Sequence, residues 1–341
     1  MIRLKWIDIA RGIGVILVII GHLSKFYEGI GQWIYSFHMP LFFALSGILF
    51  FVKKEWEKKP SAFLVSKLKG LAFPYVTISV ANIVYDLILH GFEHAKGYII
   101  DTILLNGIIA LWFLPALFFS EMILHFWINW FRKHNFIAIV FLVIAICLAT
   151  IYSCTGVNFI DYSGSLYYIF MCLNILSRII YGLIFLLLGC LGIYFYEVFF
   201  SKLNNSIKIS TLIICGVLSV CLYRFNAVLL SNCIIGNVAL FYINAINGSV
   251  FIIGVSCFIT KYGKILEFYG ANSLVIFSTH FNFGLIPLAG KIWGFDFCKP
   301  VGIFLIVLII ETILVLVVNK YFRFVVSYKD FRKLITKISQ R

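Results

Sequence analysis

Long apolar stretches, separated by short polar or basic segments, make up most of the chain. Ten of these stretches approach the length that a helix needs to cross a bilayer, which is about 20 mostly apolar residues. They lie at 9–27, 33–52, 71–90, 108–128, 136–153, 178–199, 209–225, 238–259, 272–292 and 300–320. The pattern predicts an all-α fold: a polytopic integral membrane bundle of about ten transmembrane helices.

Composition and charge support this prediction. Hydrophobic residues make up 62% of the chain and charged residues 12%, which excludes a soluble enzyme and a disordered protein. Of the 28 Lys and Arg residues, 21 fall in the two terminal segments and in every second segment between the stretches. Five fall in the remaining segments. Basic residues gather on the cytoplasmic side of membrane proteins, so both termini are predicted to be cytoplasmic. We expect a membrane domain over 1–325, a basic cytoplasmic tail over 326–341, contact with lipid and no nucleic-acid partner.

The first apolar stretch carries ionisable residues, which are costly inside a membrane and are often functional there. Arg11 and His22 are 11 residues apart, close to three helical turns, so they share one face about 16 Å apart along the axis. Asp8 lies one turn before Arg11 and is expected to pair with it. This face resembles the wall of a polar passage. Alternatively, Arg11 extends to the lipid headgroups and His22 bonds a nearby carbonyl.

The second stretch contributes His38, in the segment Phe-His-Met-Pro that ends at Pro40. Helices joined by a short loop usually pack together, so His22 and His38 are expected at similar depth on neighbouring helices. The alternative for His38 is an interfacial residue beside a proline kink. His280, in the ninth stretch, either joins the same polar cavity or is a core residue with a satisfied hydrogen bond.

Other polar and aromatic residues add weaker signals. Glu121 and Glu311 lie in the middle of stretches, where we expect structural hydrogen bonds. Lys67 and Lys69 precede the third stretch at its cytoplasmic end and suit an anionic, phosphate-bearing ligand. Trp112 is either an interfacial aromatic residue or the floor of a sugar site. The nine Cys stand singly and are predicted to be small buried residues; no metal site is expected.

Histidine is the best available reactive group in this sequence. The chain has no GxSxG, HExxH, P-loop or Gly-rich dinucleotide turn. A histidine can act as a general base near neutral pH, because its ordinary pKa is about 6.5. General-base catalysis typically contributes about 10²–10⁴-fold in rate.

Two segments resemble the acyltransferase-3 family of integral membrane O-acyltransferases. The residues 6–12, WIDIARG, followed by His22, are similar to the family's signature. The residues 37–47, FHMPLFFALSG, are similar to the second-helix motif of its fucose 4-O-acetylase-like branch. The segments 67–75, 111–118 and 270–280 follow in the family's order, so the resemblance covers most of the chain.

The resemblance implies a bacterial cytoplasmic-membrane enzyme of about ten helices. Such an enzyme takes an acyl group from cytoplasmic acetyl-CoA or another acyl-CoA, without a metal. It acylates a hydroxyl of a surface polysaccharide, lipopolysaccharide, exopolysaccharide, peptidoglycan or lipid-linked sugar precursor.

By the same likeness, His22 is the catalytic base and Arg11 belongs to the same essential motif. His38 is expected to bond the other reactant, and Lys67 and Lys69 to hold the donor phosphates. Family members often carry Arg before the third-helix Pro-Tyr, where this chain has only Lys.

Asp8, Trp112 and His280 complete the predicted set of substrate- or donor-binding residues. An alternative is a transporter or exporter of a polar solute, with Arg11, His22 and His280 as a proton relay. A regulatory membrane protein that kept the fold without the activity is a third possibility.

Overall fold

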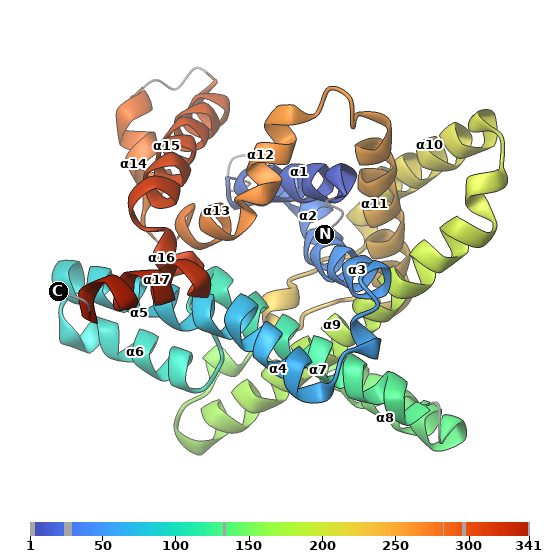
Figure 1. Ribbon diagram of the computed structural model, residues 1–341, viewed down its shortest axis with the longest axis horizontal. Coiled ribbons are helices and arrows are strands. Elements are labelled where there is room, and N and C mark those ends of the chain that lie inside the picture. Colours follow the sequence, from blue (N-terminus) through green and yellow to red (C-terminus); the bar gives the residue numbers. More distant parts are fainter. Residues whose placement is uncertain (1–3, 24–28, 132–133, 282, 295–297, 340–341) are drawn as a thin grey trace. The chain divides into compact units, whose positions relative to one another are not determined.

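Helices form almost all of the secondary structure of this protein. The computed structural model describes residues 4–23, 29–131, 134–281, 283–294 and 298–339 (Figure 1). Within these ranges the extended structure is limited to an isolated antiparallel bridge between Leu229 and Ile234. The predicted all-α fold is therefore confirmed for the described part of the chain. The predicted first stretch, 9–27, and the basic residues Lys25, Arg132 and Lys133 fall partly or wholly outside it.

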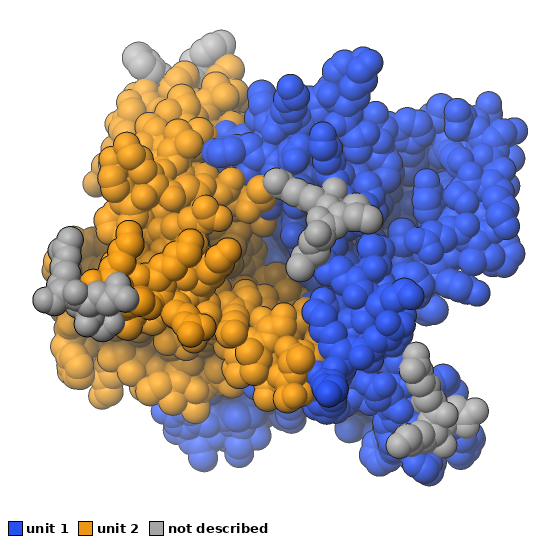
Figure 2. All heavy atoms as spheres, in the orientation of Figure 1, with its two compact units in different colours: residues 1–60, 119–270 blue, residues 61–118, 271–341 orange. Residues whose placement is uncertain are grey.

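The chain forms two compact units, each built from separate parts of the sequence (Figure 2). Unit 1 contains residues 1–60 and 119–270, and unit 2 contains residues 61–118 and 271–341. The helices of unit 1 are α1 (Lys5–His22), α2 (Ile30–Tyr35), α3 (His38–Val52), most of α7 (Phe113–Phe131), α8 (Asn135–Cys154), α9 (Gly164–Val198), α10 (Asn205–Leu222), α11 (Val238–Phe258) and α12 (Lys264–Ala271). Those of unit 2 are α4 (Pro60–Lys67), α5 (Phe73–His90), α6 (Phe92–Ile103), α13 (Ser273–Thr279), α14 (Leu285–Trp293), α15 (Lys299–Tyr321), α16 (Arg323–Val326) and α17 (Tyr328–Ser339).

The described part of the chain contains eight helical segments that are long and apolar enough to cross a membrane. They are Ile30–Val52, Pro60–His90, Ile109–Phe131, Phe136–Cys154, Gly164–Lys202, Asn205–Phe225, Val238–Phe258 and Lys299–Tyr321. The remaining two of the ten predicted spans are α1, which is 18 residues long but carries three charged residues, and the stretch at 272–292. A polytopic helical membrane protein is confirmed, whereas the number ten and the cytoplasmic termini stay predictions.

The ninth predicted span is wrong as a single helix. Two helices, α13 and α14, replace it, and the second begins after Gly284, whose φ is +64°. That left-handed conformation is open to glycine at little cost. Pro287 then lies in the first turn of α14, where its missing N–H breaks no helical hydrogen bond. Both residues therefore favour a new helix over a continuous one.

Two other boundaries also differ from the prediction. The stretch 33–52 is divided between α2 and α3, since Pro40 sits in the first turn of α3 and its ring would clash with a helical carbonyl four residues earlier. The sixth predicted span, 178–199, is the second half of α9, a helix of 35 residues that begins at Gly164.

Helices α3 and α9 pack backbone against backbone in unit 1, through glycines on both helices. A Cβ atom at Gly47 would collide with the carbonyl oxygen of Leu186, and one at Gly189 with that of Ala44. Small residues of this kind let membrane helices approach closely. The thiol of Cys190 donates a hydrogen bond to the carbonyl of Gly47 at 3.2 Å across the same contact. This pairing fixes α3, the helix that begins at His38.

Gly189→Ala is expected to destabilise unit 1, because its new methyl group would lie against the Ala44 carbonyl carbon at 2.9 Å. Overpacking of this kind typically costs about 1–3 kcal/mol. Gly192→Ala is the matched control three residues away, since no atom lies within 4 Å of its Cβ position. Thermal unfolding in detergent should show a lower midpoint for Gly189→Ala alone. Equal midpoints for the two variants would contradict the close packing.

In unit 2, α5 and α6 lie side by side and enclose a small apolar core (Figure 1). Tyr75, Ile78 and Leu111 are buried in this core, together with Ile108 and Leu114. The Tyr75 hydroxyl donates a hydrogen bond to the Thr102 carbonyl at 2.9 Å, which ties the start of α5 to the end of α6. This core supports α5 and α6, which also carry polar residues at the surface of unit 2.

Candidate functional site

The continuous helix α1 places Asp8, Arg11 and His22 on one face, as the sequence predicts. Arg11 Nη1 and Asp8 Oδ1 are 4.0 Å apart, so the expected ion pair is confirmed. Three turns of α-helix separate Arg11 from His22, about 16 Å along the axis. A distance of this size means that the two side chains contact different parts of any ligand that lies along α1.

The guanidinium of Arg11 pairs with one buried carboxylate, that of Asp8. Asp8 is 9% exposed, so it is largely shielded from water. A buried carboxylate is costly unless a cation or hydrogen-bond donors compensate it. Arg11 therefore stabilises the Asp8 carboxylate, in addition to any contact with substrate. Glu121 of α7 is also buried in unit 1, at 5% exposed.

Two glycines let α1 and α12 meet at this point. A Cβ atom on Gly12 would collide with the Leu266 carbonyl oxygen, and one on Gly270 with the Asp8 carbonyl oxygen. The two positions belong to segments 6–12 and 270–280, which carry the family resemblance. Their small size therefore has a physical reason, since any larger residue would move the backbone next to Arg11.

His22 and His38 both contact the ring of Tyr35. The ring centroids of His22 and Tyr35 are 6.2 Å apart, and those of Tyr35 and His38 are 5.3 Å apart. The Tyr35 hydroxyl donates a hydrogen bond to the Gly21 carbonyl at 3.0 Å, next to His22. The prediction that the two imidazoles lie close together on neighbouring helices is confirmed, with Tyr35 between them.

The first turn of α3 sets the orientation of His38. Its side chain is 8% exposed, and its Nδ1 lies 2.9 Å from the Ile34 carbonyl oxygen. A carbonyl oxygen only accepts, so Nδ1 carries the proton and the neutral ring presents the lone pair of Nε2. In this form His38 can accept a hydrogen bond from a hydroxyl. It does not have a second N–H with which to polarise a carbonyl.

The remaining predicted residues belong to unit 2. His280 is fully buried, and its Nδ1 donates to the Ile276 carbonyl at 2.8 Å, which is the arrangement expected for a core histidine. Thr279 donates to the buried carboxylate of Glu311 at 2.8 Å, a structural bond of the kind expected there. Trp112 is 6% exposed, which leaves little of its ring for a sugar or for lipid. A substrate role for His280 or Trp112 stays a prediction.

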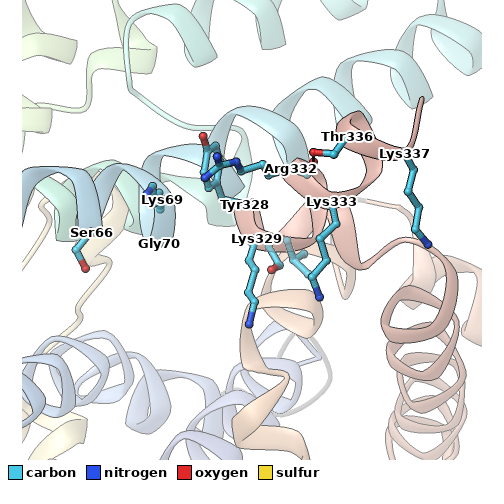
Figure 3. A pocket seen from close by; sticks show the side chains of 11 residues that line it. Ser66, Lys69, Gly70, Tyr328, Lys329, Arg332, Lys333, Thr336 and Lys337 are labelled. Carbon is cyan, nitrogen blue, oxygen red and sulfur yellow. Dashed lines mark hydrogen bonds between the residues drawn. The ribbon is translucent and has the colours of Figure 1, made fainter. Parts of the chain in front are cut away.

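A strongly basic cavity lies in unit 2, between the start of the third predicted span and the C-terminal helix α17. Its volume is about 820 Å³. Lys69 and Gly70 line it from a π-helical turn, Leu68–Ala72, which is a rare geometry often found at functional sites. The facing cations from α17 are Lys329, Arg332, Lys333 and Lys337. Figure 3 shows the three lysines of α17 extending to the same side.

Only one of the two predicted donor-binding lysines lines this cavity. Lys69 does so, and its ammonium also lies 5.3 Å from the centre of the Tyr328 ring. The Lys67 ammonium instead lies 5.1 Å from the centre of the Phe63 ring, and Lys67 is not among the lining residues. Arg332 supplies the guanidinium that the sequence lacks before the third span.

An ion pair orders the segment that carries α17. Asp330 Oδ2 lies 3.3 Å from Arg323 Nε, and Asp330 Oδ1 lies 3.8 Å from the ammonium of Lys333. The pKa of Asp330 is held below its ordinary value, first by a hydrogen bond from Ser327 and then by the nearby Arg323 and Lys333. Asp330 therefore stays ionised at neutral pH and joins α16 to α17 next to the basic cavity.

Sequence reasoning missed Tyr35 and the residues of α17. A signal for α17 was the repeat of Lys329, Arg332, Lys333 and Lys337 at helical spacing, within the segment predicted as a basic cytoplasmic tail. The division into domains 1–325 and 326–341 stays a prediction.

Comparison with known families gives one match that covers most of the chain. The family model described as an acyltransferase domain, Acyl_transf_3, matches residues 4–320. No curated protein and no solved structure matched the chain. The matched range includes Arg11, His22 and His38 and ends one residue before the end of α15. The chain therefore belongs to the acyltransferase-3 family and is a membrane acyltransferase.

Proposed function

We propose that this protein is an O-acyltransferase of the bacterial cytoplasmic membrane, in the fucose 4-O-acetylase-like branch of its family. It moves an acyl group, in the simplest case acetyl, from cytoplasmic acyl-CoA to a hydroxyl of a cell-surface glycan or a lipid-linked sugar precursor. The observation that supports this most is the cluster of His22, Tyr35 and His38, in which His22 shares one face of α1 with the Arg11–Asp8 pair.

In the proposed reaction His22 acts as the general base. It takes the proton from the acceptor hydroxyl as the hydroxyl oxygen forms a bond to the thioester carbonyl carbon. The carbon–sulfur bond then breaks, and the proton passes to the sulfur of the leaving CoA. His38, whose Nε2 presents a lone pair, accepts a hydrogen bond and orients a hydroxyl. A covalent acyl-histidine route is also compatible with two neighbouring imidazoles.

Arg11 has a different role in this proposal. About 16 Å of helix separates it from His22, so it cannot contact the carbonyl that His22 helps to attack. We assign Arg11 to a part of the donor remote from the thioester, where its charge and planar fork would orient the chain of the donor. Asp8 pairs with the guanidinium.

The basic cavity of unit 2 is proposed to bind the phosphates of acyl-CoA. Lys69 and four cations of α17 line it, and phosphate groups are bound by just such clusters of ammonium and guanidinium groups. Anionic lipid headgroups carry the same phosphate chemistry, so an experiment must separate the two ligands. The 3′-phosphate of the donor makes this possible, because a donor without that phosphate can be compared with the complete donor.

Arg332→Ala is expected to raise KM for acetyl-CoA about 10–100-fold, because it removes charge-assisted hydrogen bonds worth about 1.5–3 kcal/mol. The effect should be much smaller with acetyl-dephospho-CoA, which lacks the 3′-phosphate. Lys96→Ala, at an exposed position of α6 outside the cavity, is the control. Measurements in nanodiscs of zwitterionic lipid remove competition from anionic headgroups. An unchanged KM, with loss of bound anionic lipid from Arg332→Ala, would assign the cavity to lipid instead.

The transporter alternative can be separated from the enzyme in purified protein. Release of CoA thiol from acetyl-CoA, dependent on His22 and stimulated by a sugar acceptor, supports the acyltransferase. Proton-coupled uptake of a polar solute into proteoliposomes without acyl-CoA would support transport. His280 belongs to unit 2, is buried, and donates from Nδ1 to the Ile276 carbonyl oxygen.

A further inference from the structure

Three ionisable side chains at the junction of α5 and α6 form a cluster that the proposed reaction does not use. Asp86 and His90 are on the last turns of α5, one helical turn apart, and His94 is in the first turn of α6. The chain turns between the helices at Gly91, whose φ is +84°, a conformation that favours glycine. This turn brings His94 back beside His90, with ring centroids 5.0 Å apart.

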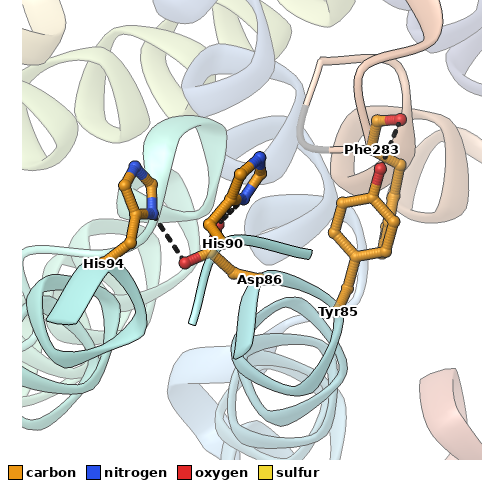
Figure 4. Close-up of polar contacts among 5 residues, drawn as sticks. All are labelled: Tyr85, Asp86, His90, His94 and Phe283. Carbon is orange, nitrogen blue, oxygen red and sulfur yellow. Dashed lines mark hydrogen bonds and ion pairs between the residues drawn. The ribbon is translucent and has the colours of Figure 1, made fainter. Parts of the chain in front are cut away.

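One buried carboxylate orients both imidazoles. His90 Nδ1 lies 2.7 Å from one oxygen of Asp86, and His94 Nδ1 lies 2.6 Å from the other (Figure 4). The Asp86 side chain is 5% exposed, whereas those of His90 and His94 are 54% and 55% exposed. A carboxylate only accepts, so each Nδ1 carries a proton, and the neutral rings keep a lone pair on Nε2. Figure 4 shows the two distal nitrogens on the side away from Asp86.

This arrangement matches the way proteins hold transition-metal ions. A metal-binding histidine usually donates its other N–H to a carboxylate, which fixes the tautomer and raises the basicity of the ligating nitrogen. Two imidazoles that share a tetrahedral zinc ion, with Zn–N distances of about 2.0–2.1 Å, have centroids about 5 Å apart. The centroid separation of His90 and His94, 5.0 Å, is of this size. When each of the three residues is counted with one atom, a ring nitrogen of either type or a carboxylate oxygen, those atoms lie within 4.8 Å of one another.

We propose that His90 and His94 bind a divalent transition-metal ion of the zinc type through their Nε2 atoms, with Asp86 as the residue that positions both rings. Water molecules complete the coordination. The ion links the last turn of α5 to the first turn of α6 across Gly91, at the end of the third predicted span that is expected to be extracytoplasmic.

Zinc binding by the purified chain, freed of any polyhistidine tag and held in nanodiscs, tests this proposal. Equilibrium dialysis against micromolar Zn²⁺, followed by elemental analysis, should find one more zinc per chain in the wild type than in His90→Ala/His94→Ala. The free cysteines are identical in both proteins, so the difference reports this site alone. Asp86→Asn should weaken the affinity about 10–100-fold while keeping the site. His134→Ala, which changes an exposed histidine of unit 1, should leave zinc binding unchanged.

A second measurement needs no variant at this site. Copper(II) added at one equivalent to the wild type should give an electron paramagnetic resonance spectrum with splitting from two imidazole nitrogens. Equal zinc content in the wild type and the double variant would overturn the proposal, as would a copper spectrum with no imidazole splitting. The cluster would then be a pair of hydrogen bonds that join two helices. Neither result bears on His22, so failure here leaves the proposed acyl transfer untouched.

Discussion

His22→Ala is expected to lower kcat for acyl transfer about 10²–10⁴-fold, the usual contribution of a general base. The loss should fall on kcat more than on KM, because the proposed proton transfer occurs only in the transition state. Imidazole added in solution should restore part of the activity, since the deleted ring leaves space next to Tyr35. Release of CoA thiol under saturating donor and acceptor measures each effect.

Two controls separate chemistry from folding in this experiment. His134→Ala removes an exposed histidine from the same unit and should leave kcat unchanged. Tyr35→Phe keeps the ring that contacts His22 and His38 but removes the hydroxyl that bonds the Gly21 carbonyl. It should lower activity less than His22→Ala does. A His22→Ala enzyme with near wild-type kcat would contradict the assigned base.

The second large effect is expected at Arg11. Arg11→Met would leave the buried carboxylate of Asp8 without its cation, and breaking a buried pair costs about 3–5 kcal/mol. We expect this variant to accumulate poorly in membranes. Arg11→Lys keeps the charge but loses the planar fork. It should therefore fold, while kcat/KM falls about 10–100-fold through lost charge-assisted hydrogen bonds of about 1.5–3 kcal/mol.

Three measurements identify the cause of the Arg11 effect. Membrane levels and thermal midpoints report folding, and kcat/KM reports the contact with substrate. Arg11→Lys with a normal midpoint and reduced kcat/KM supports a role in orienting the donor. Wild-type kinetics in Arg11→Lys would mean that Arg11 only neutralises the buried carboxylate of Asp8.

Features that depend only on the periodicity of a single helix were predicted correctly from the sequence. The spacing of Asp8, Arg11 and His22 needs only the periodicity of one helix, and both the ion pair and the shared face are confirmed. The proximity of His22 and His38 needs one more assumption, that neighbouring helices pack together. That assumption holds, although the ring of Tyr35 lies between them.

Features that depend on tertiary contacts were missed. Apolar runs do not show whether a helix continues through them, so the breaks before His38 and near Gly284 were overlooked, as was the full length of α9. The basic cavity joins residues far apart in the sequence, Lys69 and Arg332 among them, and no local pattern pairs these two positions. Asp86 and His94 likewise meet only because the chain turns back after α5.

The most direct test of the proposed acyl transfer is proton NMR of surface glycan purified from cells that carry the wild type or His22→Ala, with matched membrane levels of the two proteins. The wild type should add an O-acetyl methyl signal and shift the sugar proton at the acylated hydroxyl downfield. Both changes should be absent with His22→Ala. Glycans that carry the same O-acetyl signal in both strains would contradict the assignment of His22 as the catalytic base.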